Sequence, residues 1–318
     1  MELISLGIDI GGTNTVAGFV DRDGKVLAKL NIRTSDFDLL DDFLDALTLE
    51  INKCFESLQN GYRLCGIGIG APNGNYFTGT VDFAPNLRWK GILPLAEKFH
   101  ERFNVPAVLT NDANAAAIGE MMYGGARGMK DFVVVTLGTG VGSGFVVNGE
   151  LVYGHDGFAG ELGHTIVDIE GRFCGCGRKG CLETYTSASG LKRTVLELLE
   201  KSHVPSNLRV FSMDSISAKN IAEEANKGDA IALEAFEITG KILGLSLANT
   251  IAITSPEAIF LYGGLSKSGN VLFEPTKKYM ELYLLNIFKN KVKLLCSELE
   301  SDHAAILGAS ALVWKEMS

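Results

Sequence analysis

The sequence predicts a mixed α/β protein built from two similar lobes. A pattern of strand, Gly/Thr-rich turn, strand, Gly turn and strand occurs at residues 6–26 and again at residues 134–152. Such a repeat implies two related units that face each other, each with a hairpin tip. Long helical patterns alternate with the strands, and a chain of 318 residues favours two domains over one.

Composition excludes several classes of protein. The chain is 46% hydrophobic and 21% charged, as in ordinary globular proteins, and its net charge of −9 argues against nucleic acid as a partner. There is no apolar run of 18 residues and no basic flank of a signal peptide, so we expect no membrane partner and a cytoplasmic location. Cys54, Cys65 and Cys296 lie in apolar stretches and are expected to be reduced core residues.

The first part of the chain predicts a meander followed by alternating helices and strands. The expected strands are residues 3–10, 15–20, 26–32, 65–70 and 107–110, and the expected helices are residues 39–58, 93–103 and 114–123. A turn-rich loop is expected from Pro72 to Asn86. Because a strand, not a helix, follows the Gly11-Gly12-Thr13-Asn14 turn, a Rossmann or Walker phosphate loop is excluded.

The second part repeats the meander and then becomes helical. We expect strands at residues 132–137, 145–147, 150–153, 259–262 and 292–295, a Gly-rich turn at residues 138–144, and helices at residues 188–199, 217–226, 229–253 and 303–314. Backbone N–H groups at the two Gly-rich hairpin tips can surround phosphate oxygens. At the end of the strand 259–262, Gly263-Gly264 offers bare backbone to another part of a nucleotide.

One imidazole and three thiols fall within eighteen residues, at His164, Cys174, Cys176 and Cys181. This donor set suits tetrahedral Zn²⁺, and four protein ligands close the coordination shell, as in a structural site. The alternative is that these are reduced cysteines without a metal. A disulfide framework is disfavoured, because three clustered cysteines leave one unpaired and the chain is too large to need such bonds.

Two glutamates flank this segment, Glu161 three residues before His164 and Glu183 two residues after Cys181. A metal-bound imidazole normally donates its second N–H to another partner. Two carboxylates and that N–H would bind adjacent hydroxyls, as in a polyol or sugar; the alternative is a pair of surface glutamates. Asp112 lies where a strand meets a helix, and its simplest alternative role is to cap that helix.

These motifs together resemble the ROK family (repressor, open reading frame, kinase) of the actin-like ATPase superfamily, over essentially the whole chain. The segments that carry the resemblance are Asp9-Ile10-Gly11-Gly12-Thr13, Ala84-Pro85-Asn86-Leu87, Asn111-Asp112-Ala113-Asn114-Ala115, Leu137-Gly138-Thr139-Gly140-Val141-Gly142, Glu161-x-Gly163-His164 and Cys174-x-Cys176-Gly177-x-x-Gly180-Cys181-x-Glu183. The resemblance implies the duplicated two-lobe, ribonuclease H-like fold with a central cleft and a zinc-binding loop. We expect a small lobe of residues 1–115, joined by the helix at 302–318, and a large lobe of residues 116–301 with the zinc loop at 164–181.

The resemblance also assigns roles. Asp112 is implied as the catalytic base, and the sugar ligands as Asn86, Asn111, Asp112, Glu161, His164 and Glu183. ATP is expected against Asp9, Gly11, Gly12, Thr13, Gly138, Thr139, Gly140, Gly263 and Gly264. Asp9 is expected near Mg²⁺, directly or through water, because phosphate charge must be neutralised and hard oxygen ligands suit that ion. Structural Zn²⁺ and a homodimer complete the family expectation.

The implied activity is an ATP-dependent hexose kinase that phosphorylates the 6-hydroxyl, with glucose as the first expected substrate. The same motifs occur in kinases for N-acetylmannosamine, N-acetylglucosamine, allose and fructose. A sugar-sensing repressor is disfavoured, because the first hairpin begins at Leu3 and leaves no room for a helix-turn-helix domain; a silent sugar-binding protein would lose Asp112 or a phosphate turn. Arg88 and the loop at residues 73–78 depart from the pattern of the family's glucokinases.

Overall fold

Two five-stranded sheets with the same strand order form the centre of the computed structural model, which describes residues 1–58, 61–212, 215–299 and 303–317. The order β3-β2-β1-β4-β8 in the first sheet corresponds to β11-β10-β9-β12-β13 in the second. In each sheet three antiparallel strands are continued by two parallel ones. The predicted duplication is therefore confirmed, strand by strand.

The strands of the first sheet are β1 (Glu2–Ile10), β2 (Thr15–Val20), β3 (Val26–Ile32), β4 (Tyr62–Gly70) and β8 (Ala107–Thr110). Those of the second are β9 (Phe132–Leu137), β10 (Val141–Val147), β11 (Glu150–Leu151), β12 (Ala258–Tyr262) and β13 (Lys293–Cys296). The helices are α1 (Leu40–Glu56), α2 (Leu95–Phe103), α3 (Asp112–Tyr123), α4 (Glu183–Thr186), α5 (Ala188–Lys201), α6 (Ala218–Asn226), α7 (Ala230–Thr254), α8 (Asn270–Tyr283) and α9 (Ala304–Glu316). Short 3₁₀ turns occur at Thr34–Asp36, Leu162–His164, Asn207–Val210 and Leu265–Ser268.

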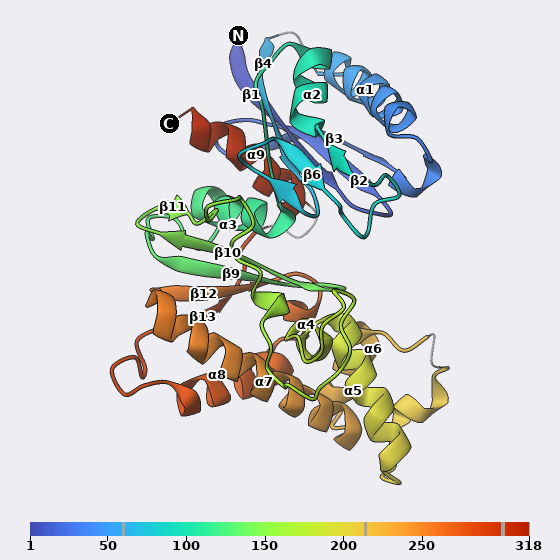
Figure 1. Ribbon diagram of the computed structural model, residues 1–318, viewed down its shortest axis with the longest axis vertical. Coiled ribbons are helices and arrows are strands. Elements are labelled where there is room, and N and C mark those ends of the chain that lie inside the picture. Colours follow the sequence, from blue (N-terminus) through green and yellow to red (C-terminus); the bar gives the residue numbers. More distant parts are fainter. Residues whose placement is uncertain (59–60, 213–214, 300–302, 318) are drawn as a thin grey trace.

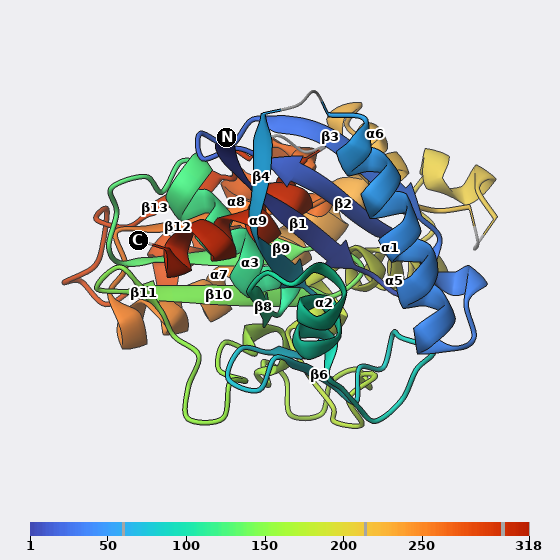
Figure 2. The same ribbon diagram turned by 90° about the horizontal axis from the view of Figure 1, so that it is seen from above.

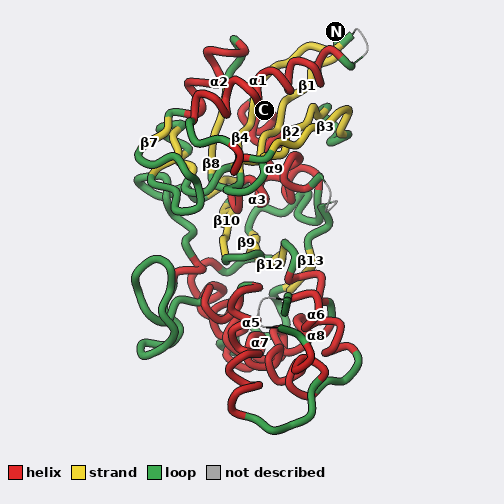
Figure 3. The backbone as a smooth tube through the Cα atoms, turned by 90° about the vertical axis from the view of Figure 1, so that its right-hand side faces the viewer, coloured by secondary structure: helices red, strands yellow, loops and turns green. Residues whose placement is uncertain are grey.

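Helices α3 and α9 lie between the two sheets, whereas α1 and α2 flank the first sheet and α7 and α8 lie beyond the second (Figure 1). Helix α9, near the C-terminus, packs on β1 and β4 of the first sheet, and α3 packs on β9 and β10 of the second. Figure 3 shows the resulting elongated shape, with α5 to α8 gathered at one end and α1 and α2 at the other. The exact division at residues 115 and 116 stays a prediction.

Glycines bring these two central helices unusually close to the sheets and to each other. A methyl group at Gly68 would lie 1.8 Å from the carbonyl oxygen of Ala309, and one at Gly144 would lie 2.7 Å from Cβ of Ala117. The helices themselves cross at Gly119 and Gly308. A Cβ added at Gly119 would lie 2.9 Å from Cα of Gly308, and one added at Gly308 would lie 2.7 Å from the carbonyl oxygen of Ala115. Since real Cβ atoms do not approach so closely, only glycine allows this packing.

The helices of the second lobe begin at the polar residues that the sequence offers. Ser217 forms a capping box with Asn220 at the start of α6, and the side chain of Asp229 accepts a hydrogen bond from the N–H of Ala232 at the start of α7. Helix α7 then buries residues at helical spacing, including Phe236 and Leu243. None of the helices in the described part of the chain combines the length and the apolarity that a membrane crossing requires.

Several expectations about local structure are wrong. The loop expected from Pro72 to Asn86 instead contains two strands, β5 (Gly74–Asn75) and β6 (Thr80–Asp82), which form a small sheet with β7 (Ile92–Leu93) from beyond the loop. The turn expected at residues 138–144 ends at Gly140, because Gly142 and Gly144 belong to β10, where α3 packs against them. The strand expected at 150–153 stops at Leu151.

Helix α8 is not among the helices expected from the sequence, and it has Pro275 in its interior, where proline usually breaks a helix. Here Pro275 packs against Gly240 of α7, which fixes the two helices side by side. Cys296 is exposed, so the expectation that it is a core residue is wrong, while Cys54 and Cys65 are partly buried. Cys296 ends β13, which pairs with only one neighbour and forms an edge of the second sheet.

Candidate active site and metal centre

The end of β8 and the start of α3 present Asn111 and Asp112. The side chain of Asn111 caps the helix by accepting a hydrogen bond of 2.7 Å from the N–H of Asn114, so the alternative in which Asp112 is the cap is wrong. The Asp112 carboxylate accepts a hydrogen bond of 2.9 Å from the N–H of Ala113, and the residue is exposed. The surrounding protein nevertheless desolvates the carboxylate and raises its pKa.

Asp9 of β1 lies next to Asp112, although 103 positions separate them in the sequence. Both approach Gly70 of β4, where an added Cβ would lie 3.4 Å from Oδ1 of Asp9 and 3.8 Å from Cα of Asp112. Burial, and then repulsion by Asp112, raise the pKa of Asp9 to about 7. Parallel pairing of β1, β4 and β8 therefore brings the two predicted carboxylates together.

The first hairpin tip leaves its polar groups accessible. The N–H of Gly11 donates to the carbonyl oxygen of Asn14 at 3.0 Å, which closes the turn, and Thr13 is exposed. Gly12 lies flat against Asn86, whose carbonyl oxygen would be 2.2 Å from an added Cβ. The predicted nucleotide turn is thus in direct contact with Asn86, the predicted sugar ligand, which is exposed.

The second tip is held from two sides. The N–H of Gly138 donates to the carbonyl oxygen of Gly140 at 3.0 Å, and that of Ala188 in α5 donates to the carbonyl oxygen of Gly138 at 2.8 Å. Thr139, at the tip, is exposed. Next to this turn, Gly263 packs against Leu137, while a Cβ added at Gly138 or at Gly264 would meet no described residue within 4 Å. The structure therefore gathers Gly138, Thr139, Gly140, Gly263 and Gly264 at one edge of the second sheet.

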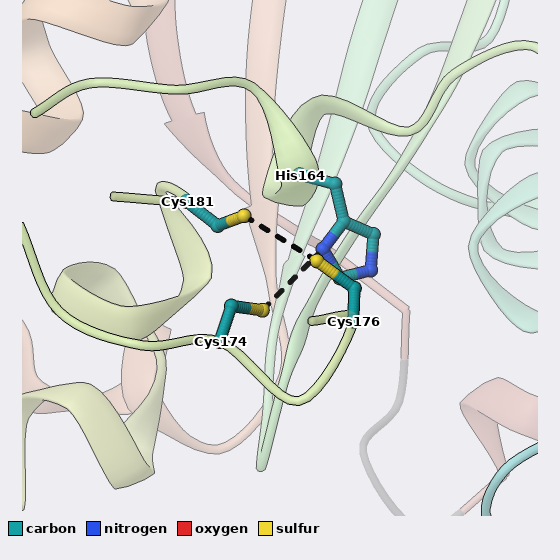
Figure 4. Close-up of side chains that lie close together, drawn as sticks. All are labelled: His164, Cys174, Cys176 and Cys181. Atoms are coloured by element: carbon teal, nitrogen blue, oxygen red, sulfur yellow. Dashed lines mark hydrogen bonds between the residues drawn. The ribbon is translucent and has the colours of Figure 1, made fainter. Parts of the chain in front are cut away.

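His164, Cys174, Cys176 and Cys181 converge on one point (Figure 4). All four ligand atoms lie within 4.8 Å of one another, with 3.7 Å between Cys174 Sγ and His164 Nδ1 and 3.6 Å between Cys176 Sγ and Cys181 Sγ. Zinc–thiolate bonds of about 2.3 Å place tetrahedral ligands about 3.8 Å apart. Both the donor chemistry and the spacing therefore fit a structural Zn²⁺ held by these four residues.

The other ring nitrogen of His164, Nε2, lies 4.0 Å from Oε2 of Glu161. Desolvation raises the pKa of Glu161; His164 opposes this rise, whereas Asp112 and Glu183 add to it. Glu183 starts α4, and its Oε2 accepts a hydrogen bond of 2.9 Å from the N–H of Val141. Glu161 is thus an electrostatic neighbour of both Asp112 and Glu183.

Negative charge in this region is left uncompensated. Among the residues that the structure describes, no Lys or Arg forms an ion pair with Asp9, Asp112 or Glu183. Carboxylate oxygens without a cation attract a hard divalent ion and accept hydrogen bonds from hydroxyls. The arrangement can therefore hold Mg²⁺ near Asp9 and bind a polyhydroxylated molecule between Asp112 and the metal cluster.

Arg172 is a structural residue of this site that the sequence did not reveal. Its buried guanidinium lies over the Tyr185 ring, donates to the carbonyl oxygen of Thr184 at 2.7 Å, and pairs with Glu197 at 2.7 Å. These contacts anchor the metal-binding loop to α4 and α5. A single arginine in a Gly-rich loop gives no sequence signal for this role, because its partners follow 12 to 25 residues later.

Comparison with known proteins agrees with this geometry. The family model of the ROK family matches residues 5–316. The chain is 35% identical to a glucokinase of Halalkalibacterium halodurans, over 97% of this chain and 94% of that protein. It is 29% identical to the xylose repressor of Bacillus subtilis, over 97% of this chain and 76% of the repressor.

Among solved structures, a ROK family glucokinase from Streptomyces griseus in complex with glucose and AMPPNP superposes with a TM-score of 0.83. It is 32% identical, and the match covers 98% of this chain and 99% of that one. These similarities extend over both sheets, the hairpin tips and the metal-binding segment. The chain therefore belongs to the ROK family.

Proposed function

We propose that the protein is an ATP-dependent hexose kinase that transfers the γ-phosphoryl group of ATP to the 6-hydroxyl of a hexose, with glucose preferred. The observation that carries this proposal is the position of Asp112. Its carboxylate lies beside Asp9 on the side of the first hairpin tip, and on the other side it raises the pKa of Glu161, next to the metal cluster. A base between a phosphate site and a polyol site is what phosphoryl transfer to a hydroxyl requires.

The chain's own residues then have defined tasks. Asp112 orients the 6-hydroxyl and accepts its proton as the oxygen takes the phosphoryl group and the bond to ADP breaks. Asn86, Asn111, Glu161, His164 and Glu183 bind the remaining hydroxyls. The backbone at Gly11, Gly12, Thr13, Gly138, Thr139 and Gly140 holds the phosphates, and Gly263-Gly264 lies against the rest of the nucleotide. Mg²⁺ near Asp9, when bound, neutralises phosphate charge.

The preference for glucose rests on two arguments. The relatives named above include glucokinases, one of them solved with glucose. In addition, carboxylates such as Glu161 and Glu183 accept hydrogen bonds from free hydroxyls, whereas an N-acetyl group at carbon 2 would replace one donor and need more room. The homodimer, the cytoplasmic location and the lack of nucleic acid and membrane partners stay predictions.

A coupled ADP-release assay with ATP and Mg²⁺ tests the proposal over glucose, N-acetylmannosamine, N-acetylglucosamine, allose and fructose. The enzyme discriminates between two sugars by the ratio of their kcat/KM values, so kcat/KM has to be measured for each sugar. We expect the highest value for glucose. If an N-acetylated hexosamine exceeds glucose about tenfold, about 1.4 kcal/mol in transition-state binding, the glucose assignment is wrong.

A sugar-sensing regulator is the second candidate, because the xylose repressor also matches nearly the whole chain. Such a protein would bind a sugar without releasing ADP. Calorimetric titration with each sugar, alongside the ADP assay, separates the two: binding without turnover for every sugar overturns the kinase and favours the regulator.

A further inference from the structure

The loop between β5 and β6 reaches across to the segment that follows β11. The Tyr76 ring stacks on the Tyr153 ring with centroids 4.1 Å apart and planes 10° from parallel, and Phe77 meets both rings edge-on. Tyr76 also donates to Oε1 of Glu316 at 2.5 Å. Figure 2 shows β6 and the chain after β11 on the same side of the molecule. We name Asn75, Tyr76 and Tyr153 the clasp.

Asn75 adds polar contacts to the stacked rings. It is only 3% exposed, and its Nδ2 donates to the carbonyl oxygen of Asp156 at 2.7 Å. Gly157, at a φ of +90°, packs on the same amide, where an added Cβ would lie 2.5 Å from Oδ1. The match between a buried amide and a glycine in the left-handed region fixes the register of the two segments.

Both ends of this connection lead to predicted site residues. On one side, Gly74 packs against the carbonyl oxygen of Thr110, which would lie 2.4 Å from a Cβ added at Gly74. Thr110 is two positions before Asp112. On the other side, the chain runs from Gly157 to Gly160, whose carbonyl accepts a hydrogen bond from the Ser143 hydroxyl, and Glu161 follows directly. The clasp thus joins β8, the strand that leads to Asp112, to the segment that carries Glu161.

We propose that Asn75, Tyr76 and Tyr153 are positioning residues of the sugar site, which hold Glu161 at a fixed place relative to Asp112. This inference rests on the proposed hexose kinase activity. Misplacing a substrate-binding group by about 1 Å can cost up to about 100-fold in rate. The phosphate-binding turns are anchored elsewhere, through Asn14, Ala188 and Leu137. Loss of the clasp therefore weakens binding of the hexose and leaves binding of the nucleotide unchanged.

The experiment compares Tyr76→Ala, Tyr153→Ala and Tyr76→Phe with a matched control, Tyr279→Ala. Tyr279 stacks on Tyr283 and bonds to Glu237 as Tyr76 stacks on Tyr153 and bonds to Glu316, but it lies on α8. We expect both clasp alanine variants to raise KM for the hexose about tenfold and to leave KM for ATP within about twofold. The effect of the double alanine variant on KM should be less than the product of the two single effects, since both single variants remove the Tyr76–Tyr153 stack.

The conservative variant and the control decide between positioning and mere packing. Tyr76→Phe keeps the stacked ring and should retain the wild-type KM for the hexose, as should Tyr279→Ala. If the hexose KM stays unchanged in the clasp alanine variants, or rises together with the ATP KM, the proposal is overturned. If Tyr76→Ala does not fold, Tyr76→Leu, which keeps apolar volume without an aromatic face, carries the same test.

A readout that does not depend on turnover keeps this inference separate from the kinase proposal. Amide hydrogen exchange at residues 154–164 should be at least about tenfold faster in Tyr76→Ala than in Tyr279→Ala, because local opening is no longer opposed by the clasp. Equal exchange rates in the two variants would overturn the proposal that the clasp holds this segment in place, even if the enzyme is active. Absence of ADP release by the wild-type protein overturns the kinase proposal alone.

Discussion

The carboxylate of Glu183 accepts a hydrogen bond from the N–H of Val141 at 2.9 Å, while its other oxygen lies 3.8 Å from Sγ of Cys174. Val141 directly follows the turn at Gly138 to Gly140. A single side chain thus connects the metal-binding loop to the predicted phosphate turn, and the sugar and nucleotide sides of the site share one structural link.

Glu183→Ala should therefore weaken the binding of both substrates. We expect KM for ATP and for the hexose to rise about tenfold each, because a hydrogen bond to a charged group contributes about 1.5–3 kcal/mol. Glu183→Gln keeps an acceptor for Val141 and should impair the hexose alone. Steady-state kinetics with each substrate varied in turn measure the split; an unchanged ATP KM in Glu183→Ala would contradict the link.

Asp112→Asn should retain hexose binding and lose turnover. An amide cannot take the proton of the 6-hydroxyl, and we expect kcat to fall by about 10² to 10⁴. Calorimetry for the sugar and ADP release for turnover check the two halves of this expectation. Asp42→Asn, at an exposed carboxylate of α1, is the control and should behave as wild type. A near-normal kcat in Asp112→Asn would remove Asp112 as the base.

The raised pKa of Asp9 predicts a pH-dependent stability in the absence of Mg²⁺ and nucleotide. Its folded pKa is about 7, against 3.8 as a reference for the unfolded chain. The stability that protonated Asp9 contributes is therefore full below pH 3.8 and is lost as the pH rises to about 7. Asp9→Asn abolishes this loss, so its Tm should exceed that of wild type by about 3 °C or more at about pH 8.

At about pH 5 the difference in Tm should be smaller, because the folded wild-type protein then keeps Asp9 protonated. Calorimetric scans of Asp9→Asn, Asp42→Asn and wild type at both pH values provide the comparison. A Tm difference that does not change with pH would show that Asp9 titrates normally.

Cys176→Ser tests the metal centre. Structural zinc sites supply about 10–16 kcal/mol of apparent binding free energy, so removing one thiolate should lower the zinc content, the Tm and the hexose affinity together. We expect one zinc per wild-type chain by elemental analysis. Cys296→Ser, at another exposed cysteine, should change none of the three quantities. Freshly purified wild-type protein without zinc would contradict the assignment.

Much of the fold was predictable because its signals are local. The paired strand and turn patterns fixed both meanders, and the spacing of His164 and the three cysteines predicted their cluster. What escaped prediction depends on contacts between distant segments. Strands β5 to β7 are two or three residues long, too short for an alternation of polar and apolar residues, and α8 contains a proline that is tolerated only through its packing on α7.

The glycines of β10 illustrate the same limit at the site. Gly142 and Gly144 resemble part of a phosphate turn in the sequence, yet in the structure they make room for α3. Likewise, the proximity of Asp9 to Asp112, and the hydrogen bond from Val141 to Glu183, follow from strand order and loop anchoring. Neither can be inferred from spacing along the chain.

The position of α9 on the first sheet has a consequence for synthesis on the ribosome. About 190 residues separate the end of β8 at Thr110 from the start of α9 at Ala304. At about 5–20 residues per second, the glycine-lined face of β1 and β4 waits roughly 10 to 40 s for the helix that covers it. During that interval the nascent first lobe exposes the apolar face that α9 later covers, and chaperones bind exposed apolar surface of this kind.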